Sequence, residues 1–252
     1  MGGYLNRERE TVIFMRREDS IDVPAKWQGM PERGTMGKER VLALSDGVIA
    51  IIITIMVLDF KHPESPDLSG LRPLLPVFLG YVLSFVNIAI YWNNHHHMFA
   101  AVERVNGAVL WANAHLLFWL SLFPLMTVWL GQFPNASWPA AAYGIVLLCA
   151  SIAYGILLNV LLNAQGPGSL LAKAVGSDLK GKLSTVVYAV SILCAFIHPW
   201  IADAMFTAVA LVWLSPDTRI EKALATAEKD AALKRAKPRT RRCQKEDTKP
   251  DC

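Results

Sequence analysis

The sequence predicts an all-α integral membrane protein with six transmembrane helices per subunit and both termini in the cytoplasm. Its 252 residues are 53% hydrophobic and only 18% charged, which is a low charged fraction for a soluble domain. The charges crowd into residues 1–40 and 216–252, and the segments between them are almost uninterrupted apolar runs. The positive charges also follow the pattern that sets the orientation of a membrane protein.

The hydropathy fits six spans, because about 20 apolar residues are needed to cross a bilayer. The expected spans are residues 41–60, 74–94, 108–130, 138–162, 183–198 and 199–214, and the last two form a tight hairpin. With the N-terminus inside, 23 of the 25 Lys and Arg residues lie in the inner segments, and only Lys61 and Arg72 lie outside. This asymmetry agrees with an even number of spans and predicts a multi-pass protein of the cell's inner (plasma) membrane.

The chain divides into three parts. Residues 1–38 form a basic cytoplasmic tail that mixes charges with Pro and Gly, so we expect it to be disordered. Residues 39–215 form the six-helix transmembrane domain, and residues 216–252 form a second basic cytoplasmic tail, partly helical over 217–236. Because residues 1–40 lack a continuous apolar segment, we expect no secretory signal, and the first span would direct membrane insertion.

The first span, RVLALSDGVIAIIITIMVLDFK, has two different faces. At 100° per residue, one face carries Arg40, Leu44, Gly47, Ile51, Thr54 and Leu58. Ser45 and Asp46 point away from that face, toward neighbouring helices. Several copies around an axis would present rings of Ile51, Thr54 and Leu58, a narrow apolar constriction of the kind that gates by dewetting. The alternative is that these aliphatic residues make ordinary lipid or packing contacts.

The second span ends in a polar stretch, LSFVNIAIYWNNHHHMF. Its helical spacing gives one aromatic face and one adjacent polar stripe: Trp92, His95, His96 and Phe99 on the first, and Ser84, Asn87, Tyr91 and Asn94 on the second. Polar groups in a membrane need partners, and Asp46 is a suitable acceptor, so we expect a structural hydrogen-bond network. Consecutive histidines on a helix diverge by 100° and cannot all face one ion, so we predict no metal site.

Other chemistry finds no support in the sequence. Cys149, Cys194, Cys243 and Cys252 have neither a disulfide pattern nor metal-ligand spacing. His115 and His198 are isolated, and we identify no nucleophile–base pair, phosphate-binding glycine loop or metalloprotease motif. We therefore predict no catalytic residues, no enzyme activity and no cofactor. The net charge of +4 comes largely from the tails and is explained by membrane topology, not by nucleic-acid binding.

Two separated motifs resemble the transmembrane protein 175 family of potassium channels. Arg40-Val-Leu-Ala-Leu44-Ser45-Asp46-Gly47 is similar to the R-x-x-x-F-S-D-G signature that opens the family's first helix. Residues 91–99, YWNNHHHMF, look like the family's second-helix element Y-W-x-N-H-H-x-x-F. Leu44 departs from the signature where Phe is typical, a change that is conservative in volume.

The resemblance implies a moderately potassium-selective cation channel, a homotetramer in the bilayer with monovalent cations as permeant species. The first helix would line a central pore, without the Thr-Val-Gly-Tyr-Gly filter of ordinary potassium channels. By analogy, Ile51 would form the main constriction, Thr54 would offer hydroxyls or carbonyls to a partly dehydrated ion, and Leu58 would add an apolar layer. The pore helix would be held by a network of Arg40, Ser45, Asp46, Trp92, His95 and His96.

Two alternatives remain open. The first is a proton-coupled or other secondary cation transporter that uses Asp46 with His95 or His96 as a relay. Transporters usually have internal repeats and broken helices, and the sequence predicts neither here. The second alternative is a non-conducting membrane scaffold whose tails recruit partners.

Overall fold

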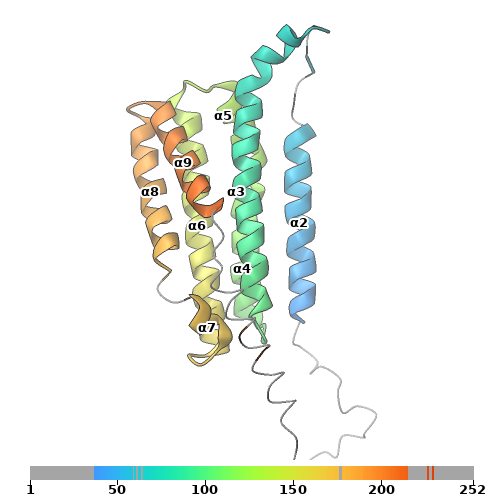
Figure 1. Ribbon diagram of the computed structural model, residues 1–252, viewed down its shortest axis with the longest axis vertical. Helices are drawn as coiled ribbons and strands as arrows, with labels where there is room; N and C mark the ends of the chain where they lie inside the picture. The colour runs from blue at the N-terminus through green and yellow to red at the C-terminus, as the bar shows by residue number, and fades with distance from the viewer. Residues whose placement is uncertain are drawn as a thin grey trace, which may run out of the picture. The chain divides into compact units, whose positions relative to one another are not determined.

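A computed structural model describes residues 37–58, 60, 62–63, 65–175, 178–214, 226 and 229 (Figure 1). The predicted tails, 1–38 and 216–252, lie almost wholly outside these residues. Within the described ranges the regular secondary structure is helical. The elements are α2 (Lys38–Leu58), η3 (Leu68–Leu74), α3 (Leu75–Ala100), α4 (Gly107–Ser121), α5 (Phe123–Gln132), α6 (Ser137–Gln165), α7 (Leu170–Val175), α8 (Leu179–Ala195) and α9 (Pro199–Leu214).

Among the described residues, four helical segments are long and apolar enough to cross a membrane: Lys38–Leu58, Leu68–Ala100, Gly107–Gln132 and Ser137–Gln165. They correspond to the first four expected spans, so the prediction of an all-helical membrane protein is confirmed. α8, with 17 residues, and α9, with 16, match the last two expected spans in position but are shorter than the other four helical segments. Six spans per subunit and two cytoplasmic termini stay predictions.

α6 is the central helix of the fold and packs against α4, α5, α8 and α9. Its inward face carries fully buried residues, among them Tyr143, Leu147 and Leu157. Small residues let the neighbouring helices come close, as is common between membrane helices. A Cβ atom placed on Gly144 would lie 2.9 Å from the ring of Phe206, so only glycine fits at this contact.

The third expected span, 108–130, forms one helical segment, Gly107–Gln132, that is kinked at Leu122 between α4 and α5. The cause is Pro124 in the first turn of α5, because proline lacks an amide proton and clashes with the preceding helical turn. Leu122 keeps right-handed helical angles, and its N–H bonds the carbonyl of Trp119 at 3.3 Å. The break is therefore a kink without an unwound segment.

At the other end of α4, Asn106 caps the helix, because its side chain accepts a hydrogen bond from the Val109 amide.

α2 lies at one edge of the helix bundle, beside α3, while α8 lies at the opposite edge (Figure 1). It packs against α3, α4 and α5 through a single face. The buried residues on that face recur every three or four positions, as one side of a helix requires: Val41, Ser45, Ile49, Ile52 and Met56. The other side of α2 has no partner within the described part of the subunit.

Candidate functional site

The unpartnered side of α2 is the face that the sequence predicts to line a pore. Leu44 is 61% exposed, Ile51 58% and Leu58 80%. Arg40, Gly47 and Thr54 are exposed as well. A mainly apolar face of this kind, left open in the chain, indicates a contact with lipid or with further copies of the chain.

Two details define the chemistry of this face. The hydroxyl of Thr54 donates a hydrogen bond to the carbonyl oxygen of Ile51 at 2.9 Å. This bond uses the hydroxyl proton, so the oxygen lone pairs of Thr54 stay available as acceptors. At Gly47, an added Cβ atom would meet nothing within 4 Å, so the helix surface is open there. The face thus offers one hydroxyl oxygen between two exposed aliphatic side chains, Ile51 and Leu58.

Behind this face, a buried chain of hydrogen bonds joins α2 to α3 through α4. Asn113 donates from Nδ2 to Ser45 Oγ at 2.9 Å, and its Oδ1 lies 2.7 Å from Nε2 of His95. Ser45 in turn donates to the carbonyl of Val41 at 2.9 Å. Because the Asn113 oxygen can only accept, the His95 proton on this contact is on Nε2. Nδ1 of His95 is buried and has no hydrogen-bond partner in the described part of the chain.

A second, half-exposed contact joins α2 directly to α3. The indole nitrogen of Trp92 donates to Oδ1 of Asp46 at 2.8 Å. The ring of His96 lies 6.0 Å from that of Trp92, tilted by 36°. A carboxylate that accepts from an indole N–H has the partner that an acid inside a membrane helix requires.

These contacts bring together five of the six residues expected to support the pore helix. Ser45 and His95 meet through Asn113, while Asp46 and Trp92 meet directly and His96 stacks beside them. The backbone N–H of Arg40 donates to the carbonyl of Gly37 at 3.0 Å, but its exposed side chain makes no hydrogen bond or ion pair with any other described residue. The role of these six residues in holding a pore helix stays a prediction.

Sequence reasoning missed Asn113, the residue that links the two helices. Its signal was available: a lone amide in the apolar segment GAVLWANAHLLFWLS is costly in a membrane and needs a partner. It was overlooked because nothing in the sequence shows which helix α4 faces.

The fold and these contacts define a class: an all-helical membrane protein in which α2 is anchored on one face and open on the other. The family model described as "Endosomal/lysosomal potassium channel TMEM175" matches residues 40–124, which include both sequence motifs. A potassium channel of Chryseobacterium sp. (strain P1-3) is 51% identical over 189 residues, covering 75% of this chain and 98% of the relative. The chain belongs to the TMEM175 family, as its sequence motifs predicted.

Other relatives extend the comparison. A potassium channel of Chamaesiphon minutus is 30% identical over 196 residues, 72% of this chain and 94% of the relative. The crystal structure of a lysosomal potassium-selective channel TMEM175 homolog from that organism superposes with a TM-score of 0.63 at 26% identity. It covers 70% of this chain and 96% of that one. The family consists of ion channels, so the expectation that the chain is not an enzyme is confirmed.

Proposed function

We propose that this chain forms a potassium-selective cation channel whose pore is lined by α2. One observation carries the proposal: α2 exposes Ile51, Thr54 and Leu58 on one face while its opposite face is hydrogen-bonded and buried. A helix that is packed and hydrogen-bonded on one side and exposed on the other suits a position around a symmetry axis shared by several copies of the chain. The potassium-channel names of the relatives from Chryseobacterium and Chamaesiphon support the choice of ion.

The constriction would act through dehydration. Rings of Ile51 and Leu58 form short apolar layers in which an ion loses part of its water shell, and potassium loses water more cheaply than sodium. Thr54 lies between them and would present hydroxyl oxygens to the partly dehydrated ion. Selectivity of this origin needs no carbonyl cage and is expected to be moderate. Potassium is the permeant ion here, and no cofactor takes part.

The pore requires several copies, because one subunit supplies only one lining helix. We propose a homotetramer in the plasma membrane with six spans per subunit. Both termini would lie in the cytoplasm, as the positive charges of the tails favour. The unpartnered face of α2 would then point to the axis, and the apolar outer faces of the other helices would meet lipid.

Ion flux through purified protein in liposomes tests the proposal. Potassium should cross faster than sodium, driven only by its own gradient. Equal fluxes of the two ions would contradict potassium selectivity. Flux that depends on a proton gradient would favour the transporter that uses Asp46 and His95 or His96, and ion-tight liposomes would favour the scaffold. Asp46 and His95 have different hydrogen-bond partners, Trp92 and Asn113, so no direct hydrogen bond between them supports the relay.

A further inference from the structure

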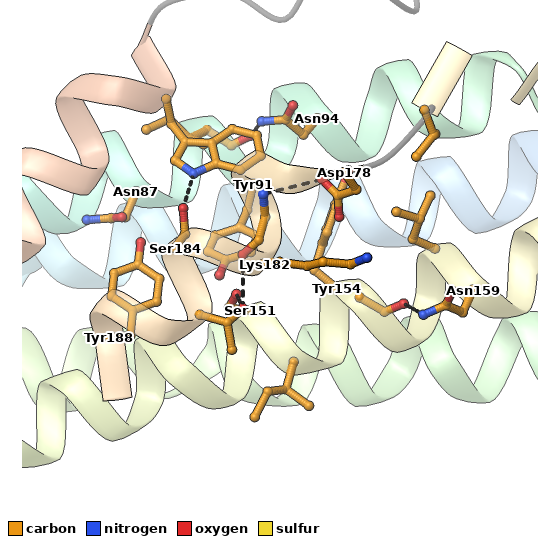
Figure 2. Close-up of a pocket in the computed structure, with 18 of the residues that line it drawn as sticks. Asn87, Tyr91, Asn94, Ser151, Tyr154, Asn159, Asp178, Lys182, Ser184 and Tyr188 are labelled. Carbon is orange, nitrogen blue, oxygen red and sulfur yellow. Dashed lines mark hydrogen bonds between the residues drawn. The ribbon is translucent and has the colours of Figure 1, made fainter. Parts of the chain in front are cut away.

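A cavity of about 280 Å³ lies inside the subunit, away from α2 (Figure 2). Its walls come mainly from α3, α6, α8 and α9, with Val175 at the end of α7. Asn94 lies near the last turn of α3, Leu162 near the end of α6, and Asp178 at the start of α8. Trp213 is next to the last residue of α9. The cavity therefore lies between these helices and extends toward one end of the bundle.

Two tyrosine hydroxyls in this cavity have no hydrogen-bond partner among the described residues: those of Tyr91 and Tyr188. The Tyr188 side chain is 97% buried, with 3% of its surface exposed. Both rings border the same space (Figure 2). Because both residues line the cavity, their hydroxyls can donate to a polar group that enters it.

Acceptors complement these hydroxyls. Asn94 donates its amide to the carbonyl of Ile90 at 2.8 Å, and Asn159 donates to the carbonyl of Gly155 at 2.8 Å. Each amide nitrogen thus donates within its own helix, and neither amide oxygen accepts a hydrogen bond from a described residue, so both remain available as acceptors. A ligand that carries both acceptors and donors matches this lining.

The lining of the same cavity includes a positively charged side chain. Lys182 lines it, is exposed, and forms no ion pair with any described residue. Asp178, the acid in the lining, accepts a hydrogen bond from the Gly181 amide and so caps α8. The ammonium of Lys180 lies 4.6 Å above the ring of Trp213, whose indole donates to Ser184. Lys182 is thus the lysine in the lining itself, and its exposed ammonium is the group that can meet an anion.

The remaining wall is aliphatic and reaches the outer surface of the bundle. Leu158 and Leu162 line the inner side, while Ile152 lines the cavity and is also 45% exposed. An apolar chain can therefore enter from the lipid side of α6 and keep the rest of its length in the bilayer.

From this lining we infer that the cavity binds one membrane phospholipid per subunit, with its phosphate at Lys182. Its ester carbonyls accept hydrogen bonds from Tyr91 and Tyr188, and a hydrogen-bond-donating head group, such as glycerol or ethanolamine, meets the oxygens of Asn94 and Asn159. One acyl chain leaves along Ile152. The site is separate from the α2 face, so phospholipid binding to it can be tested independently of ion conduction.

Native mass spectrometry of the delipidated full-length protein tests the inference without measuring conduction. The probes are phosphatidylglycerol, phosphatidylethanolamine and phosphatidylcholine, added separately at matched concentrations. We expect one tightly held phosphatidylglycerol or phosphatidylethanolamine per subunit, and weaker retention of phosphatidylcholine, whose head group has no donor. Lys182→Gln should weaken the tight binding about tenfold, the loss expected for one charge-assisted contact.

Arg104→Gln is the matched control, because Arg104 is an exposed cation between α3 and α4, outside the cavity lining. It should leave the tight binding unchanged. The double variant Tyr91→Phe, Tyr188→Phe removes only two hydroxyls and should also weaken phospholipid binding. Equal losses in Lys182→Gln and Arg104→Gln would overturn the site, since they would reflect general surface charge. Equally tight binding of soluble glycerophosphoglycerol would overturn the assignment of a lipid.

Discussion

Asn113 on α4 donates a hydrogen bond to Ser45 on α2 at 2.9 Å, although 68 positions separate the two residues along the chain. Both side chains are buried, and the same amide reaches His95 on α3 through its oxygen. One side chain thus ties three helices together behind the exposed face of α2. The predictions below separate this anchoring from the conduction that we propose.

Replacing Asn113 tests the anchor. Asn113→Leu keeps a similar volume but leaves Nε2 of His95 buried without its acceptor, a loss that costs about 2 kcal/mol of unfolding free energy. We expect a clear fall in the thermal unfolding temperature of the purified protein in detergent. Asn93→Leu is the control, because Asn93 is exposed on α3. Similar stability in the two variants would show that the buried bond contributes little.

The Trp92–Asp46 contact should contribute less, because the indole is 42% exposed. Trp92→Phe removes the N–H donor and keeps an aromatic ring, and we expect a loss of about 1 kcal/mol, again read from thermal unfolding. Trp111 on α4 is 80% exposed, so Trp111→Phe controls for the change of ring size. A smaller loss for Trp92→Phe than for Trp111→Phe would argue against a stabilising contact.

Conduction should respond to the polarity of the constriction. Ile51→Asn places an amide in the proposed apolar ring, which would hold water and raise single-channel conductance severalfold in planar bilayers. Val57→Asn makes the same kind of change at a position that is 48% exposed, about 120° around the helix from Ile51. Unchanged conductance in Ile51→Asn would remove Ile51 from the constriction.

Selectivity should respond to Thr54. Thr54→Val keeps the shape and removes the hydroxyl oxygen, so the permeability ratio of potassium to sodium should fall toward one. A contact of about 1 kcal/mol corresponds to about a fivefold change in that ratio, which reversal potentials can resolve. Thr207→Val is matched, since Thr207 on α9 likewise donates to its own helix, to the carbonyl of Asp203. A ratio that stays the same in Thr54→Val would mean that the hydroxyl does not meet the ion.

Much of the fold follows from hydropathy, because a membrane helix must bury every backbone polar group within itself. The expected span 199–214 coincides with α9, and 138–162 lies inside α6. The kink at Leu122 and the short helices η3 and α7 were missed. Each depends on local backbone geometry, which hydropathy does not record.

The candidate site was predictable in part. Helical periodicity separates the Ile51 face of α2 from Asp46, and the exposures of these residues agree with that separation. The partner of His95 was not predictable, because the sequence does not say that α4 packs on α2 and α3. The cavity lined by Tyr188 was not predictable for the same reason, because it forms between helices whose packing the sequence does not show.

Ser45 and Asp46 are adjacent in the chain, yet they bond to different helices, one to Asn113 on α4 and the other to Trp92 on α3. Their side chains leave α2 about 100° apart. Rotation of α2 about its own axis would therefore break at least one of the two bonds. In the proposed channel, the width of the pore would have to change by tilting or bending of α2, with the same residues facing the ion in every state.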